Sequence, residues 1–256
     1  MNIVITGASS GLGAETAALL AAEGHRVILG SRSIQKLKEV KKRIQSEGGS
    51  CEVYALDVTN EQSCVQFMKQ AEENNGSVDI LINNAGAGTF KKIEELQAVE
   101  VEEMLSVNVT GVHNMTKAAL PYMKARDQGK LLFISSLAGK IPSPKASVYA
   151  ASKHAVIGYA RAVRMELAGT NVNVSIFYPG PIDTPFLDKA DKTGNYRSRL
   201  GRMMLTVRET AVAVGKLTEK KSRESHLPKV GFLLSVLYQT APKIVEKAAG
   251  KQFQKK

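Results

Sequence analysis

The chain begins with Asn2-Ile-Val-Ile-Thr-Gly7-Ala-Ser-Ser-Gly11-Leu-Gly13, which predicts a strand, a glycine-rich turn and the start of a helix. The β-branched run at residues 3–5 is typical of a buried strand, and the glycines after it end that strand. Residues 14–23 then carry apolar side chains at helical spacing. Glycines let a backbone approach a ligand, and the free N–H groups at a helix start attract an anion. The segment therefore predicts a pyrophosphate site, although a tight βα turn without a ligand would use the same residues.

The spacing of these glycines narrows the class of phosphate site. It reads Gly-x-x-x-Gly-x-Gly, whereas the commonest dinucleotide fingerprint is Gly-x-Gly-x-x-Gly. No lysine follows Gly13, so the segment is not the Gly-x-x-x-x-Gly-Lys loop of nucleotide triphosphatases.

Composition places the chain among globular proteins with one substantial core. It has 256 residues, of which 43% are hydrophobic, and this length suits one domain over residues 1–256. Two cysteines (Cys51 and Cys64) and four scattered histidines form neither a disulfide framework nor a set of metal ligands. We therefore expect a reducing, cytoplasmic environment and no metal. The first predicted strand begins at Asn2 and no apolar run reaches about 18 residues, so we expect no signal peptide and no membrane span.

The positive charge is concentrated near the C-terminus. The formal net charge is +11; residues 1–184 carry 19 Lys and Arg against 18 Asp and Glu, whereas residues 185–256 carry 16 against 6. A uniformly basic protein would suggest a nucleic-acid partner, but this asymmetry indicates one basic face. We therefore expect no nucleic-acid partner.

Predicted strands and helices alternate along most of the chain. After the first strand, strands are predicted at residues 26–29, 52–56, 79–82, 130–134 and 173–177, with a last one near 225–228. Helices are predicted at residues 14–23, 33–45, 60–75, 98–126, 147–167, 206–217, 230–240 and 242–249. This alternation is typical of βαβ units and predicts a single-domain α/β fold with a doubly wound, Rossmann-type parallel sheet. Ligands of such sheets bind at the carboxyl ends of the strands.

Residues 185–205 interrupt the alternation. They are polar and basic, lack clear periodicity and follow a predicted strand end, so we expect a substrate loop or lid there. Its charge favours a substrate with a carboxylate or phosphate, which would meet the basic residues of the loop. These are Lys189, Lys192, Arg197, Arg199 and Arg202.

Several polar residues fall at predicted strand ends or in the helices beside them. Tyr149 and Lys153 are four residues apart on one helix face, Ser136 follows the fifth predicted strand, and Asn108 lies in the helix before that strand. Two further segments are Asn83-Asn-Ala-Gly86 and Pro179-Gly180. Together with the glycine-rich turn, these residues resemble the short-chain dehydrogenase/reductase family in order and approximate spacing over about residues 2–184.

The chemistry of this family explains why these residue types are needed. Reduction of a carbonyl by a nicotinamide requires a proton donor, and the pKa of a free tyrosine is near ~10. A lysine ammonium one helical turn away favours the phenolate, so we expect Tyr149 to be the general acid/base and Lys153 to lower its pKa. Ser136 would hold the substrate oxygen. The resemblance further implies that Lys153 bonds the nicotinamide ribose and that Asn108 positions a water for proton relay.

The cofactor preference is predicted from the end of the second strand. NAD-binding folds usually place a carboxylate about 20 residues past the glycines. Here Ser31 and Arg32 occupy that place, and no Asp or Glu lies between Glu23 and Glu39. A guanidinium can bind the 2′-phosphate of NADP bidentately, so we expect NADP(H) to be preferred over NAD(H). The turn and the resemblance imply the other cofactor contacts: Gly7, Ser9, Ser10, Gly11, Leu12, Gly13, Asp57, Val58, Asn83, Ala85, Gly86, Tyr149, Lys153, Pro179, Gly180, Ile182 and Thr184.

We therefore expect an NADP(H)-dependent oxidoreductase that interconverts a small-molecule carbonyl and an alcohol. The alternative is a catalytically inactive NADP-binding sensor or scaffold of the same fold, in which the same residues serve as caps and packing. An epimerase or dehydratase is a weaker alternative, because such chains are usually longer and have a different glycine spacing. Many members of the family pair through the helices near residues 98–126 and 147–167, which implies a homodimer or homotetramer.

The last two predicted helices combine apolar and basic residues. The stretch Phe232-Leu-Leu-Ser-Val-Leu-Tyr238 is more apolar than a surface helix needs, and basic residues flank it. They are Arg208, Lys220, Lys221, Arg223, Lys229, Lys243, Lys247, Lys255 and Lys256. This combination is typical of helices that lie on an anionic membrane surface. Buried terminal helices are common in this fold, so we favour packing on the sheet or on a neighbouring subunit over peripheral membrane contact.

Overall fold

The β-rich segments pair as seven parallel strands of one sheet in the computed structural model, which describes residues 1–201, 204–220 and 222–253. The strands are β1 (Asn2–Thr6), β2 (Arg26–Ser31), β3 (Ser50–Ala55), β4 (Ile80–Asn83), β5 (Gly129–Ile134), β6 (Val172–Pro179) and β7 (Glu224–Leu227). Their order across the sheet is β3-β2-β1-β4-β5-β6-β7, so the direction of winding reverses between β1 and β4. The predicted doubly wound fold is confirmed, and ligands of such sheets bind beside this reversal.

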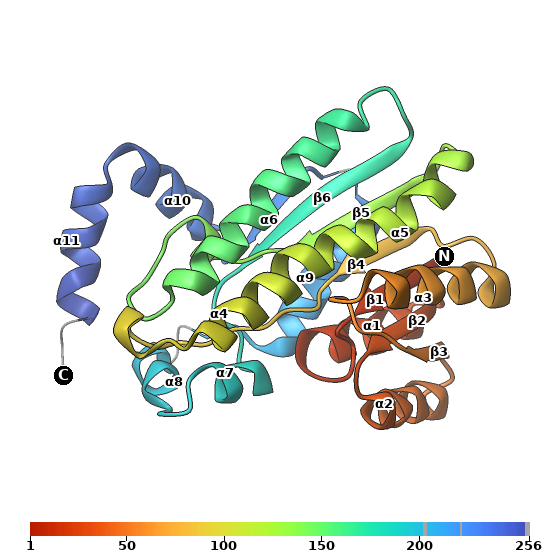
Figure 1. The fold of residues 1–256 in the computed structure, drawn as a ribbon, viewed down its shortest axis with the longest axis horizontal. Coiled ribbons are helices and arrows are strands. Elements are labelled where there is room, and N and C mark those ends of the chain that lie inside the picture. The colour runs from red at the N-terminus through yellow and green to blue at the C-terminus, as the bar shows by residue number, and fades with distance from the viewer. Residues whose placement is uncertain (202–203, 221, 254–256) are drawn as a thin grey trace.

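Helices cover both faces of the sheet (Figure 1). One face carries α1 (Gly11–Ala22), α2 (Ile34–Ser46) and α9 (Val207–Glu219), and the other carries α3 (Glu61–Asn75), α5 (Gly111–Ala125) and α6 (Ser147–Glu166). Side chains of β1 alternate between the two layers: Ile3 and Ile5 join the core under the first set, and Val4 joins the core under the second. The remaining helices are α4 (Ala98–Leu105), α7 (Pro185–Ala190), α8 (Asn195–Leu200), α10 (Val230–Thr240) and α11 (Pro242–Phe253).

Two segments differ from their predictions. The helix expected over residues 98–126 is interrupted by a π-helical turn at Ser106–Thr110, between α4 and α5. The loop expected over residues 185–205 contains the short helices α7 and α8, whose apolar side chains pack with Phe90 and Ala146 in a small separate core. Helices of six residues are too short to show periodicity in the sequence, so only the packing reveals them.

The C-terminal helices α10 and α11 lie beside the layered body, at one end of its long axis (Figure 1). The buried residues of α10 are Gly231 and Ser235, whereas the large apolar side chains of this helix are exposed. The apolar stretch therefore does not pack on the sheet, and its packing on a neighbouring subunit stays a prediction. Within the described ranges, no helix is both long enough and apolar enough to cross a membrane.

Candidate active site

A cavity of about 550 Å³ lies at the carboxyl ends of the strands. The segments that follow β1 to β6 contribute to its wall, because the carboxyl ends of parallel strands meet at one edge of the sheet. The sequence-predicted residues that line it are Gly7, Ser9, Ser10, Gly11, Leu12, Gly13, Ser31, Arg32, Asp57, Val58, Ala85, Gly86, Ser136, Tyr149, Lys153, Pro179, Gly180, Ile182 and Thr184. Two predicted residues, Asn83 and Asn108, lie behind this wall.

The side chain of Asn83 points away from the cavity. Asn83 is the last residue of β4, and its buried amide donates a hydrogen bond to Thr116 Oγ1 at 3.3 Å. Its side chain is therefore not available to a cofactor. Because side chains alternate along a strand, the next residue, Asn84, turns to the cavity side and donates Nδ2 to Thr6 O at 2.9 Å. The sequence contains both asparagines side by side, but only the register of β4 decides which one faces the ligand.

The turn after β1 forms a cradle that has no room for side chains. Gly7 has a φ of +66°, and a Cβ at Gly13 would lie 2.6 Å from Asn84 Nδ2 and 2.8 Å from Gly7 O. Ser10 precedes α1 in an extended conformation without a side-chain cap, and the first turn of α1 contains no acidic residue. The first N–H groups of a helix lack intrahelical partners and carry its positive end. These features fit a pyrophosphate at the start of α1.

Two basic side chains lie at the cavity edge beyond β2. Arg32 and Lys36 both line the cavity, and Arg32 is 68% exposed with a long ion pair of 3.8 Å to Glu103. Among the residues that the structure describes, neither a buried partner nor a short ion pair holds Arg32 away from an incoming phosphate. Arg32 was predicted from the sequence, whereas Lys36 was not. Lys36 follows Arg32 by four residues, about one helical turn, and this spacing could have indicated that the two side chains lie close together.

Tyr149 and Lys153 extend from α6 into the cavity. Lys153 Nζ lies 5.9 Å from the centroid of the Tyr149 ring and donates to Ile134 O at 3.0 Å. Burial lowers the pKa of Lys153 to about 8. Burial also raises the pKa of Tyr149 to about 12, although a hydrogen bond with Ser136 acts to lower it. Desolvation therefore dominates the pKa of Tyr149 in the protein by itself, and the lowering effect of Lys153 stays a prediction.

Ser136 caps a helical turn at the cavity wall. It precedes a 3₁₀ turn at Leu137–Gly139, and its hydroxyl accepts a hydrogen bond from Ala138 N at 3.1 Å, which is a cap. The same side chain also hydrogen-bonds Tyr149. The cap fixes the hydroxyl beside the phenol, where both groups can reach one substrate oxygen.

Asn108 supports the site from behind. It is fully buried on the π-helical turn, where its Oδ1 accepts from Ala87 N at 2.8 Å and its Nδ2 donates to Ala87 O at 2.8 Å and to Ser152 Oγ at 2.9 Å. Both amide protons are used, so Asn108 joins the segment after β4 to α6. A Cβ at Gly86 would lie 3.4 Å from Asn108 Oδ1 and 3.5 Å from Lys153 Nζ, which places the two side chains around one glycine. π-Helical turns are frequent at functional sites.

Aromatic rings enclose the Tyr149 end of the cavity. The ring centroid of Tyr149 lies 5.5 Å from that of Phe90 and 5.8 Å from that of Phe186, and Phe90 lies 4.7 Å from Tyr196. Other apolar residues of this end are Ile141, Leu187 and Leu200. The apolar end of the cavity was not predicted from the sequence, because no local pattern connects residue 90 with residues 186 and 196.

The basic side chains of residues 185–205 that the structure describes differ in their surroundings. Lys189 lines it, but Arg197 forms ion pairs with Asp183 at 2.9 Å and Asp188 at 3.4 Å. Arg202 lies outside the described residues, as does the side chain of Arg199. Of the basic side chains that the structure describes in this segment, Lys189 lines the cavity, and an anionic substrate stays a prediction.

The thiols and possible metal ligands lie apart from this chemistry. Cys51 and Cys64 are free and buried. Among the residues that the structure describes, no group of His, Cys, Asp and Glu side chains is arranged to hold a metal ion.

The chain is similar to known proteins over most of its length. A family model described as short chain dehydrogenase matches residues 1–195. A 3-ketodihydrosphingosine reductase of Bacteroides thetaiotaomicron is 34% identical, over 92% of this chain and 90% of the relative. An alcohol dehydrogenase from Thermococcus sibiricus, solved with 5-hydroxy-NADP, is 32% identical with a TM-score of 0.78, over 88% of this chain and 94% of that one. A short chain dehydrogenase/reductase from Burkholderia phymatum, solved with NAD, shares the fold with a TM-score of 0.86 over 95% and 94% of the two chains at 22% identity.

Proposed function

Because the chain belongs to the short-chain dehydrogenase/reductase family of nicotinamide-dependent oxidoreductases, we propose that it interconverts an apolar carbonyl compound and its alcohol with NADP(H). The observation that carries the proposal is the arrangement of the cavity. A glycine cradle lies at one end, Tyr149, Ser136 and Lys153 lie at the other, and aromatic rings enclose the second end. A relative named for a 3-keto substrate supports reduction of a ketone.

The cofactor preference rests on charge at the edge of the cavity. The turn at residues 7–13 would hold the pyrophosphate, and Arg32 with Lys36 would bind a 2′-phosphate. No carboxylate lines this end except Asp57, which follows β3 and whose Oδ1 accepts hydrogen bonds from Thr59. The NADP analogue bound by the Thermococcus sibiricus relative supports the same preference.

Each residue of the site has a separate role in the proposed reaction. When bound, the nicotinamide supplies or accepts the hydride. Tyr149 keeps its proton at neutral pH, because burial raises its pKa to about 12, and it can donate this proton to a carbonyl oxygen that gains charge. Ser136 would hold the same oxygen by a hydrogen bond. Lys153, which is largely protonated at neutral pH, would stabilise the phenolate that remains.

The test uses ketones of increasing apolar chain length with NADPH, and it follows NADPH oxidation by absorbance. We expect turnover by the wild-type protein, and we expect Tyr149→Phe to lower kcat by about 100-fold or more while changing the Kd for NADPH little, because only the proton donor is lost. Tyr122→Phe, on α5 and away from the cavity lining, is the matched control and should keep full activity. Full activity of Tyr149→Phe would disprove the mechanism, and NADPH binding without turnover of any ketone would favour the sensor alternative.

A further inference from the structure

The helices α10 and α11 expose a continuous apolar surface, here called the C-terminal ridge. Its large side chains have exposed fractions between 41% and 66%. They are Val230, Phe232, Leu233, Leu234, Val236, Leu237 and Ile244. Single exposed apolar residues are common on proteins, but a contiguous group of this kind marks an interaction surface.

The buried side of α10 shows why the ridge points outward. Gly231 and Ser235, one helical turn apart, are buried against the body. A Cβ at Gly231 would lie 2.7 Å from Leu137 Cδ1, so the helix backbone packs directly on a residue of the cavity wall. This close approach uses the narrow face of the helix, and the large apolar side chains of the wide face remain at least 41% exposed.

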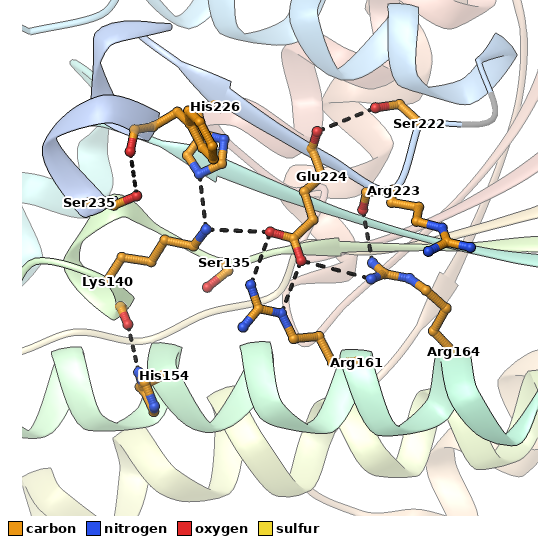
Figure 2. Close-up of polar contacts among 12 residues, drawn as sticks. Ser135, Lys140, His154, Arg161, Arg164, Ser222, Arg223, Glu224, His226 and Ser235 are labelled. Carbon is orange, nitrogen blue, oxygen red and sulfur yellow. Dashed lines mark hydrogen bonds and ion pairs between the residues drawn. The ribbon is translucent and has the colours of Figure 1, made fainter. Parts of the chain in front are cut away.

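A polar network holds the base of the ridge rigidly against the body (Figure 2). Glu224 of β7 accepts hydrogen bonds from Arg161 at 2.9 and 3.1 Å and forms an ion pair with Lys140 at 3.3 Å. His226, two residues along β7, lies 3.1 Å from Lys140 Nζ, and its ring contacts Phe232 with centroids 5.3 Å apart. The start of the ridge therefore contacts the body through the ring of His226.

The charge beside the ridge is positive. Lys229 precedes α10, while Lys243 and Lys247 lie on α11, and no described carboxylate lies within ion-pair distance of these three residues. From residue 229 to the end, the sequence contains six lysines and one acidic residue, Glu246, which accepts a hydrogen bond from Tyr238. A second copy of the chain docked on the same face would bring these lysines close to their equivalents, which is unfavourable.

We propose that the C-terminal ridge docks the protein on an anionic lipid surface. Apolar side chains of α10 would enter the boundary between headgroups and acyl chains, and the lysines would face anionic headgroups. Because α10 packs on Leu137, docking brings the wall of the cavity to the lipid surface.

Flotation with lipid vesicles tests the apolar part of this proposal. We expect the full chain to float with vesicles that contain phosphatidylglycerol, to float far less with pure phosphatidylcholine vesicles, and to be released by high salt. Leu233→Glu should lower the partition coefficient on anionic vesicles about tenfold or more, because it places a charge where an apolar side chain is buried. Ile93→Glu, at a residue 77% exposed on another surface, is the matched control and should bind like the wild type.

A pair of charge reversals tests the electrostatic part. Lys243→Glu with Lys247→Glu should lower binding to anionic vesicles about tenfold or more. Lys38→Glu with Lys42→Glu, an exposed pair with the same spacing on α2, changes the net charge equally and should lower it much less. Equal losses in the two double variants would show a non-specific charge effect and would overturn the proposal.

The absence of tryptophan from the sequence provides a direct probe. Leu233→Trp places the single tryptophan of the variant on the ridge, and its emission should shift to shorter wavelength and be quenched by brominated lipids on anionic vesicles. Ile93→Trp should show neither change. Failure of the wild type to float with anionic vesicles would overturn the proposal. It would also be overturned if the wild type formed a dimer that Leu233→Glu dissociates and did not bind vesicles.

Discussion

At the residue scale, Arg32 and Lys36 are the side chains that we expect to select the cofactor. Replacing both by alanine should raise the Kd for NADPH by about 10–100-fold, because charge-assisted hydrogen bonds to a phosphate are worth a few kcal/mol. The Kd for NADH should change by no more than about twofold, since NADH lacks the 2′-phosphate. Calorimetry measures both constants. Lys38→Ala with Lys42→Ala, on the exposed side of α2, serves as the control. Equal wild-type affinities for NADPH and NADH would contradict this assignment.

Burial also determines the protonation of the two central side chains of the cavity. Desolvation disfavours the charged form of each group, so it raises the pKa of Tyr149 to about 12 and lowers that of Lys153 to about 8. The phenol therefore holds its proton and the lysine loses its charge only in mildly alkaline solution. Both states suit proton donation to a reduced carbonyl at neutral pH.

At the element scale, α7 and α8 shape the apolar end of the cavity. Asp191, between them, accepts hydrogen bonds from Thr193 N at 3.1 Å and Tyr196 N at 2.6 Å, which orders the start of α8. Phe186 of α7 packs so closely that a Cβ at Gly88 would lie 2.6 Å from its ring. The two helices thus provide a defined wall and not a mobile loop.

We expect this wall to set substrate preference. Phe186→Ala should lower kcat/KM for the apolar ketone that the wild type prefers by about 10–100-fold, which corresponds to about 1–3 kcal/mol of lost contact, and should favour bulkier ketones. The Kd for NADPH should not change, because Phe186 lies at the substrate end. Met165→Ala, on the exposed end of α6, is the control. An unchanged ranking of ketones would show that α7 does not contact the substrate.

At the scale of the whole molecule, Glu224 connects segments that are far apart in the sequence. It pairs with Lys140 after β5 and with Arg161 on α6, 84 and 63 residues away. Burial pulls its pKa upward, but the hydrogen bonds from Arg161 and the positive charges of Arg161 and Lys140 lower it to about 2. Burial and the charge of Lys140 lower the pKa of the neighbouring His226 to about 4. The contribution of this cluster to the free energy of unfolding therefore depends on pH.

Acid should weaken the fold in two stages. The unfolded chain binds a proton at His226 near pH 6.5, which the folded protein resists until about pH 4, so stability falls over that interval. Glu224 contributes stability above pH 4.5 that is lost as the pH falls toward about 2.

Glu224→Gln should cost about 1–3 kcal/mol of unfolding free energy at neutral pH and remove the second stage, as measured by urea unfolding. Glu73→Gln, in an exposed pair with Lys69, should cost less than about 0.5 kcal/mol. If Glu224→Gln lowered the unfolding free energy at neutral pH by as little as Glu73→Gln does, the role of the cluster would be contradicted.

Local chemistry in the sequence was sufficient for most of the fold and for much of the site. The β-branched run at residues 3–5 with the glycines after it predicted β1, the cradle and the start of α1. The spacing of Tyr149 and Lys153 predicted that they share a helix face. These features depend on neighbours within a few residues, and so periodicity and turn chemistry reveal them.

Tertiary structure alone decided the features that depend on distant neighbours. The register of β4 turned Asn84, and not Asn83, toward the cavity. Burial, with Phe90 and Phe186 packed around the ring, raised the pKa of Tyr149 where the adjacent lysine had suggested a lower one. The apolar face of α10 points outward because its glycine side packs on Leu137. Burial and electrostatic environment are set by contacts between residues far apart in the chain, and a linear pattern does not contain those contacts.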